Sequence, residues 1–208
     1  MHQDIFKLVL ASESPRRKSL LSEAGFQFTV FPVKVSENLE KNLNVDDQII
    51  SIARRKAVAA FDQYKLLNLH NYLILTADTM VVEGNEPLGK PENPNEAFQI
   101  LRRLSGKKHQ VKTAICLVVE QPCQKDQQNN PHFICDIETT DVFFKTLTDQ
   151  EIEDYIKTGE PMDKAGAYGI QGLGGKFVEK IVGPYDNVVG LPIGLLQKML
   201  KENNWQVK

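Results

Sequence analysis

The chain has 208 residues, of which 41% are hydrophobic and 25% are charged, and its formal net charge is −2 at pH 7. These values are close to the average for globular proteins, so a substantial hydrophobic core is expected. The small net charge excludes a general nucleic-acid binder, which normally carries a basic excess. No apolar stretch approaches the roughly 20 residues that a membrane span requires. We therefore expect neither a nucleic-acid partner nor a membrane association.

The first third of the chain alternates between strand and helix patterns. The apolar run 7–12 predicts a buried strand, and Ser14 followed by Pro15 predicts a helix that begins at Pro15 and ends before Gly25. Phe, Val and Thr in 26–33 predict a second strand. A longer helix is predicted over 45–65, with one apolar face made of Ile49, Ile50, Ala53, Ala57, Ala60 and Phe61.

The remainder of the chain continues the alternation. A strand or a pair of strands, ending in a turn, is predicted over 72–84, and a helix capped by Asn93 is predicted to run to about Leu104. Strands are predicted over 109–120 and 133–147, joined by a polar linker at 122–132. The capping box 148–151 predicts a helix ending near Gly159, and a short strand (177–183) and a C-terminal helix (190–204) follow. This order predicts a single α/β domain over 1–208 around a mixed sheet.

Three cysteines, Cys116, Cys123 and Cys135, occur without a CxxC pair. An odd number of cysteines without such spacing is typical of a protein from the reducing cytoplasm. Cys123 and Cys135 flank the polar linker, and we do not expect them to form a disulfide.

Two arginines in the first turn of the predicted helix 15–24 are electrostatically unusual. Arg16 and Arg17 lie where the helix dipole is already positive, a place that normally favours Asp or Glu. A bound anion would stabilise both guanidinium groups, and a turn from a strand into a helix N-terminus is the geometry of phosphate sites. The alternative is that both side chains point into water. The P-loop pattern GxxxxGK[ST] is absent.

Asp78 lies inside the apolar run "LILTADTMVV", where a carboxylate is costly unless it has partners. It is either held by backbone N–H groups at a bend in the strand or acts as a general base or metal ligand beside a phosphate site. Glu37 is a candidate for a second oxygen ligand of Mg²⁺, although taken alone it resembles an ordinary surface glutamate.

Several further groups have both a chemical and a structural interpretation. The glycine-rich segment 160–172 is either a ligand loop, with polar contacts from Asp163, Lys164, Tyr168 and Gln171, or a surface turn. Lys56 follows Arg54 and Arg55, a charge run of the kind that usually marks a solvated helix face. Lys90 lies in a turn from which it can reach a phosphate, whereas Lys108 and His109 read as strand-entry residues. No zinc-site spacing and no GxSxG motif occurs in the sequence.

Five segments together resemble the Maf-like nucleotide pyrophosphatases, in the same order and spacing, over about residues 7–200. They are "LASESPRRKSLL", "TADTMVVEGNEPLGKPEN", "LSGKKHQVKTA", "EPMDKAGAYGIQG" and "VGPYDNVVGLP". The resemblance implies the fold of inosine triphosphate pyrophosphatases, an elongated, twisted mixed sheet flanked by helices around a central cleft. It also implies attack of water on the α-phosphorus of a nucleoside triphosphate, with Mg²⁺ or Mn²⁺ as cofactor.

The resemblance also implies roles for individual residues. Asp78 matches the catalytic acid, and Glu37 together with Asp78 is the expected metal pair. The positions that match phosphate contacts are Ser12, Arg16, Arg17, Lys56 and Lys90. The positions that match determinants of substrate choice are Arg16, Thr79 and Gln171.

The form "AYGIQG" resembles the branch that acts on dTTP and UTP, and modified pyrimidine triphosphates fit the same expectation. The alternatives are a pyrophosphatase for 7-methyl-GTP or another purine triphosphate, and a nucleotide-binding regulator of cell division with little turnover. A homodimer in the cytoplasm is the expectation for the family. Glu13 departs from the small or neutral residue usual at its position, and it is predicted either to weaken phosphate binding or to face outward.

Overall fold

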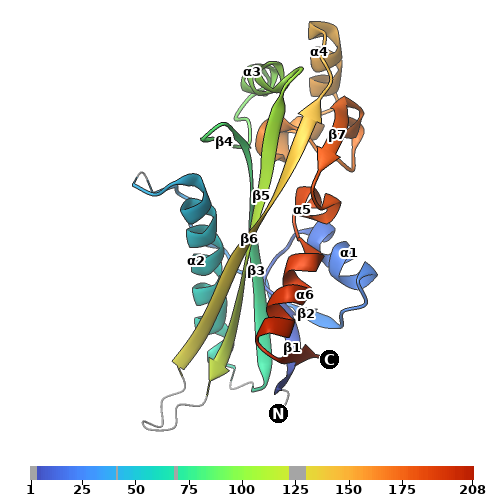
Figure 1. Ribbon diagram of the computed structural model, residues 1–208. Helices are drawn as coiled ribbons and strands as arrows, with labels where there is room; N and C mark the ends of the chain where they lie inside the picture. Colours follow the sequence, from blue (N-terminus) through green and yellow to red (C-terminus); the bar gives the residue numbers. More distant parts are fainter. Residues whose placement is uncertain (1–3, 41, 68–69, 122–129) are drawn as a thin grey trace. The chain divides into compact units, whose positions relative to one another are not determined.

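The computed structural model describes residues 4–40, 42–67, 70–121 and 130–208 (Figure 1). Its contacts divide the chain into two compact units. The first unit comprises the chain up to Asp78, with Ala114–Ile137 and Gly190–Lys208, and the second comprises Thr79–Thr113 and Glu138–Val189. Each unit is described by itself below. The single domain over 1–208 and the central cleft therefore stay predictions.

The helices and strands alternate along the chain as the sequence predicts. The strands are β1 (Asp4–Leu10), β2 (Phe28–Val30), β3 (Tyr72–Glu83), β4 (Glu86–Leu88), β5 (Lys108–Gln121), β6 (Asn130–Phe144), β7 (Val178–Val182) and β8 (Trp205–Val207). The α-helices are α1 (Pro15–Glu23), α2 (Val45–Lys65), α3 (Pro94–Leu104), α4 (Asp149–Lys157), α5 (Tyr185–Val189) and α6 (Ile193–Glu202). Short 3-10 turns, η1 to η3, cover Glu160–Asp163, Ala165–Ala167 and Leu173–Phe177. The sequence did not predict β4, β8, α5 or these turns.

The strands form one mixed sheet of eight strands in the order β2-β1-β3-β5-β6-β7, with β4 on β3 and β8 on β1. Strand β1 is parallel to β2, β3 and β8, whereas the pairs β3–β4 and β6–β7 are antiparallel. The predicted α/β class with a mixed sheet flanked by helices is confirmed.

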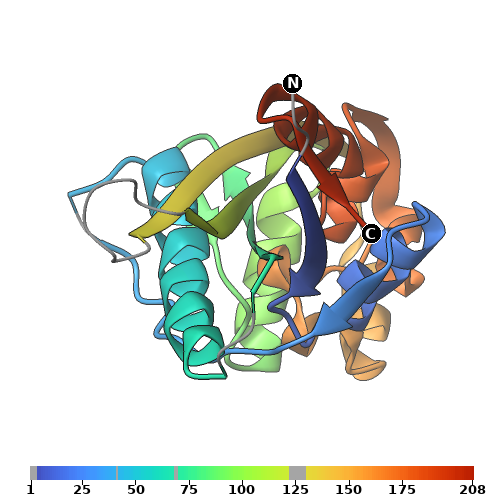
Figure 2. The ribbon, with the colours of Figure 1, turned by 90° about the horizontal axis from the view of Figure 1, so that it is seen from below.

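Helices cover both faces of the sheet in the first unit (Figure 2). Because side chains alternate along a strand, Leu73, Leu75 and Ala77 of β3 share one face and pack in a core with Leu21 of α1 and Leu196 of α6. The residues between them face α2. The buried residues of α2 are Ile49, Ile52, Ala53, Ala57, Ala60 and Phe61. The predicted apolar face is therefore confirmed at five of its six positions, whereas Ile50 is only half-buried and Ile52 is buried as well.

The predicted helix starts are confirmed by their capping contacts. The side chain of Ser14 accepts a hydrogen bond from the N–H of Arg17, and Asn93 accepts one from Glu96. Thr148 and Glu151 form the predicted capping box at the start of α4. These caps satisfy N–H groups that have no partner inside the helix.

The structure contains a disulfide that the sequence does not predict. Cys116 of β5 and Cys135 of β6 form a disulfide, with their Cα atoms 4.1 Å apart. The two cysteines face each other on neighbouring strands of the sheet, a relation that their separation of 19 residues does not reveal. Cys123, and with it most of the linker 122–132, lies outside the described residues.

The core of the second unit contains an aromatic cluster built around His109. The Nε2 atom of His109 lies 2.8 Å from the hydroxyl of Tyr168, and both side chains pack edge-to-face on Phe144. Burial lowers the pKa of His109 to about 4, so its imidazole is neutral near pH 7. Tyr168 is thus a core residue, and its predicted role as a polar ligand contact is not supported.

Candidate active site

The turn between β1 and α1 fixes Arg17 in the first unit. The Nε atom of Arg17 donates to the carbonyl of Gly190 at 2.8 Å, and its Nη1 atom donates to Ser12 Oγ at 3.3 Å. Ser12 is buried, and its Oγ also accepts from the N–H of Ser14. The guanidinium of Arg17 is therefore held in a defined position, whereas Arg16 is exposed on α1. No motif in the sequence identifies Gly190 as its partner.

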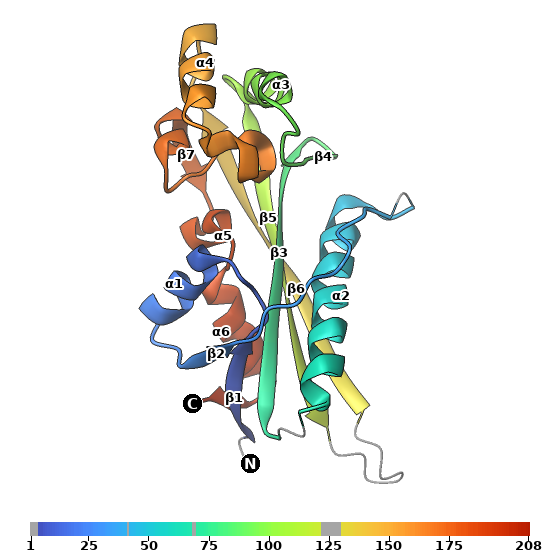
Figure 3. The same cartoon turned by 180° about the vertical axis from the view of Figure 1, so that it is seen from behind.

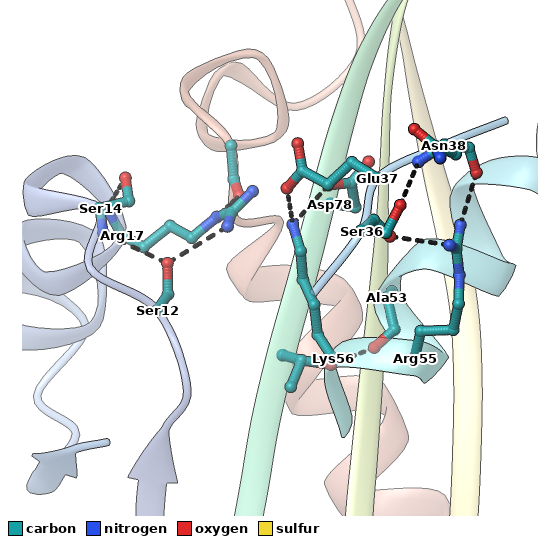
Figure 4. Close-up of polar contacts among 12 residues, drawn as sticks. Ser12, Ser14, Arg17, Ser36, Glu37, Asn38, Ala53, Arg55, Lys56 and Asp78 are labelled. Atoms are coloured by element: carbon teal, nitrogen blue, oxygen red, sulfur yellow. Dashed lines mark hydrogen bonds and ion pairs between the residues drawn. The ribbon is translucent and has the colours of Figure 1, made fainter. Parts of the chain in front are cut away.

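Asp78 faces helix α2 because of its position on β3. Thr76, two residues earlier on the same face, is buried and donates its hydroxyl to the carbonyl of Ala53 at 2.7 Å. This bond joins β3 to α2. Asp78 lies two residues after Thr76 on the strand, and Lys56 lies three residues after Ala53 on the helix. The two side chains are in contact, with Asp78 Oδ1 2.7 Å from Lys56 Nζ (Figure 4).

Glu37 completes an ion-paired group around Lys56. Its Oε1 atom lies 2.6 Å from Lys56 Nζ, so this ammonium contacts two carboxylates. The side chains of Lys56 and Asp78 are only 13% and 11% exposed, whereas that of Glu37 is 57% exposed. The interpretation of Lys56 as part of a solvated charge run is therefore wrong. Lys56 borders the apolar face of α2, and the negative charge of Asp78 stabilises the buried ammonium of Lys56.

Burial and charge have opposite effects on the two ionisable groups at the centre of the site. Burial raises the pKa of Asp78, and the positive charges of Lys56 and Arg17 oppose this shift. Burial likewise lowers the pKa of Arg17, and the negative charge of Asp78 opposes it. A carboxylate whose pKa lies above its usual range is suited to accept a proton from water near neutral pH.

The two carboxylates are arranged suitably for a divalent cation. Oxygens of Glu37 and Asp78 contact one and the same ammonium nitrogen, so both can reach a single cation. Magnesium in phosphate chemistry commonly takes one or two carboxylates together with phosphate oxygens. Within the described residues no group of three His, Cys, Asp or Glu side chains is clustered as a metal site, so phosphate or water would supply the other ligands.

The remaining predicted residues are each described within their own unit. Thr79, Lys90 and Gln171 belong to the second unit, and both Lys90 and Gln171 are exposed. The hydroxyl of Thr79 lies 3.0 Å from that of Thr113. Glu13 is exposed, as in the second of its two predicted outcomes.

A half-buried carboxylate, that of Glu160, binds the segment that carries Gln171. Glu160 accepts hydrogen bonds from the hydroxyl of Tyr155 and from the backbone N–H groups of Leu173 and Gly174. A Cβ atom at Gly172 would lie 2.3 Å from Glu160 Oε1, so a larger residue there would displace this carboxylate. Glycine therefore lets the segment lie directly against a side chain of the same unit.

The sequence matches the model of the family described as Maf-like protein over residues 7–203. The chain belongs to the Maf-like protein family. A Maf-like relative from Bdellovibrio bacteriovorus, "dTTP/UTP pyrophosphatase", is 56% identical over 94% of this chain and 97% of its own. A protein of the same name from Caldicellulosiruptor bescii is 40% identical over 94% of both chains. "Nucleoside triphosphate pyrophosphatase" from Haemophilus ducreyi is 43% identical over 97% of both.

The match to the Maf-like family covers the whole second unit and most of the first. Its bounds contain every predicted site residue, from Ser12 to Gln171. Among the described residues of this Maf-like chain, no helix combines the length and the apolar character needed to cross a membrane.

Proposed function

We propose that this chain is a nucleoside triphosphate pyrophosphatase that hydrolyses dTTP and UTP to the monophosphate and pyrophosphate. The observation that carries the proposal is the placement of Asp78 of β3, a buried carboxylate held beside Lys56 and close to Arg17 in the first turn of α1. Such a group of one base and several cations suits an anionic substrate attacked by water.

In the proposed reaction, Asp78 accepts a proton from the water that attacks the α-phosphorus. Oδ1 of Asp78 accepts from Lys56 at 2.7 Å, so Oδ2, the other oxygen of this carboxylate, is the one that takes the proton. The bond from the α-phosphorus to the bridging oxygen breaks, and pyrophosphate leaves with its electrons. Arg16, Arg17, Lys56 and Lys90 are the proposed phosphate contacts, together with the hydroxyl of Ser12. Their positive charges stabilise the negative charge that develops on the leaving group.

Glu37 and Asp78 would hold the divalent cation, Mg²⁺ or Mn²⁺. When bound, such a cation acts as a Lewis acid that neutralises charge on phosphate oxygens. Lys56 would then contact a phosphate instead of the two carboxylates, because its long side chain is flexible.

The choice of dTTP and UTP is supported by the names of the relatives from Bdellovibrio and Caldicellulosiruptor. Arg16, Thr79 and Gln171 are the proposed determinants of this choice. The side-chain amide of Gln171 has both a donor and an acceptor, as pairing with the edge of a pyrimidine requires. Modified pyrimidine triphosphates belong to the same proposal.

We further propose that the protein works in the cytoplasm as a homodimer, without nucleic acid or a membrane. Its net charge of −2 agrees with the absence of a nucleic-acid partner. The Cys116–Cys135 disulfide is unusual for a reducing cytoplasm, so the proposed location rests on the family resemblance.

Pyrophosphate release from dTTP, UTP, CTP, GTP and 7-methyl-GTP, with Mg²⁺ or Mn²⁺, tests the proposal. We expect the highest kcat/KM for dTTP and UTP, and loss of the reaction when the metal is removed with a chelator. Preference for 7-methyl-GTP or GTP would contradict the choice of substrate but not the reaction. Tight binding of nucleotides without turnover would favour a regulatory nucleotide-binding protein instead.

A further inference from the structure

The connection between β2 and α2 carries Glu37, and its described residues, 31–40 and 42–44, contain no helix or strand. It passes over β3 and along α2 (Figure 3), and its residues from Ser36 to Glu40 are exposed. Exposed segments of this kind usually have little packing to fix them. Nevertheless Glu37 Oε1 lies 2.6 Å from Lys56 Nζ. Other contacts must therefore hold the backbone near this position.

Arg55 supplies the most direct of these contacts. Its Nη1 atom donates to the carbonyl of Ser36 at 2.7 Å, and its Nη2 atom donates to the carbonyl of Asn38 at 2.9 Å (Figure 4). These two carbonyls flank Glu37. A planar guanidinium donates in two fixed directions at once, so one side chain defines the backbone on both sides of the carboxylate.

Two further side chains of α2 bind the same connection. Ser51 Oγ donates to Glu40 Oε1 at 2.5 Å, and Gln48 Nε2 donates to the carbonyl of Leu43 at 2.8 Å. Positions 48, 51 and 55 are spaced by three and four residues, so they share one face of the helix. Helix α2 therefore both carries Lys56 and holds the segment whose carboxylate binds Lys56.

We propose that Arg55 is a positioning residue, which holds the backbone at Ser36 and Asn38 so that the carboxylate of Glu37 reaches Lys56 and the active site. The expected effect of Arg55 on turnover rests on the proposed function. Its expected effect on the backbone of the segment 36–40 does not. A lysine at this position would present one compact ammonium and cannot hold both carbonyls in the same way. The neighbouring Arg54 is exposed and lies over the ring of Phe133 at 5.4 Å, which makes it a matched control.

The kinetic test is a double-mutant cycle between Arg55→Gln and Glu37→Gln, with dTTP as substrate. Misplacement of a functional group by about 1 Å can reduce a rate by about 100-fold, so each single variant should lose roughly 10-fold to 100-fold in kcat. If Arg55 acts through Glu37, the double variant is no slower than the slower single variant. Arg55→Lys should not restore the rate, and Arg54→Gln should match the wild type. Losses that multiply in the double variant, or an unchanged rate in Arg55→Gln, would overturn the proposal.

Amide hydrogen exchange of the segment 36–40 provides a readout that does not depend on turnover. We expect faster exchange in this segment for Arg55→Gln and Arg55→Lys, with wild-type exchange in Arg54→Gln and unchanged exchange in the strands of the sheet. Wild-type exchange of the segment in both Arg55 variants would overturn the proposal. If the wild type releases no pyrophosphate from dTTP, the proposed function fails, and the exchange measurement still decides the role of Arg55 in holding the connection.

Discussion

Replacement Asp78→Asn is expected to reduce kcat for dTTP and UTP by about 100-fold to 10,000-fold, the usual contribution of a general base. The amide has nearly the same shape as the carboxylate but cannot accept the proton from water. Because burial already disfavours the charged form of Asp78, the neutral amide should cost the fold little. The melting temperature should stay close to that of the wild type.

Steady-state pyrophosphate release and thermal unfolding measure these two effects separately. Asp62→Asn is a matched control, since Asp62 is an exposed aspartate of α2 in the same unit. Its activity and melting temperature should equal those of the wild type. Full activity of the folded Asp78→Asn variant would remove Asp78 from the role of base.

Replacement Lys56→Met is expected to reduce kcat/KM by about 100-fold to 1,000-fold, comparable to the loss of one donor that stabilises a developing charge. It should also shift the acidic limb of the pH–rate profile. Burial and the charge of Glu37 raise the pKa of Asp78, whereas the charges of Lys56 and Arg17 lower the same pKa. Without Lys56 the pKa of Asp78 rises, so the active carboxylate form is lost at a higher pH and the acidic limb moves to higher pH.

The pH dependence of kcat/KM for Lys56→Met, compared with Lys65→Met, tests this expectation. Lys65 is an exposed lysine in the last turn of α2, so its replacement should leave the profile unchanged. An acidic limb that keeps its wild-type position in Lys56→Met would show that Lys56 does not control the ionisation of the base.

Local signals explain why the sequence predicts the longer elements well. Ser14, Asn93 and Thr148 cap their helices as predicted, because a cap depends on residues within one turn. The elements that were not predicted, such as β4 and β8, have only three residues each, too few for a periodic pattern. β4 forms because it pairs with β3, and β8 forms because it pairs with β1. Such pairing depends on the assembled sheet and not on the local sequence.

The site residues show the same division between local and distant information. The cost of burying Asp78 in an apolar run is visible in the sequence, and the structure provides Lys56 as its partner. The charge run around Lys56 indicated a solvated position and was misleading, because packing against the sheet decides which face of α2 contacts β3. The contacts of Arg17 with Gly190 and of Arg55 with Ser36 join residues that are distant in the chain, so no local pattern pairs them. The Cys116–Cys135 disulfide depends in the same way on the alignment of two strands.

Hydrolysis of dTTP in ¹⁸O-labelled water tests the central claim most directly. If water attacks the α-phosphorus, the label appears in dTMP and the released pyrophosphate carries none. The same experiment with Asp78→Asn should give almost no product. Label in the pyrophosphate, or release of dTDP and inorganic phosphate, would contradict the proposed reaction at this site.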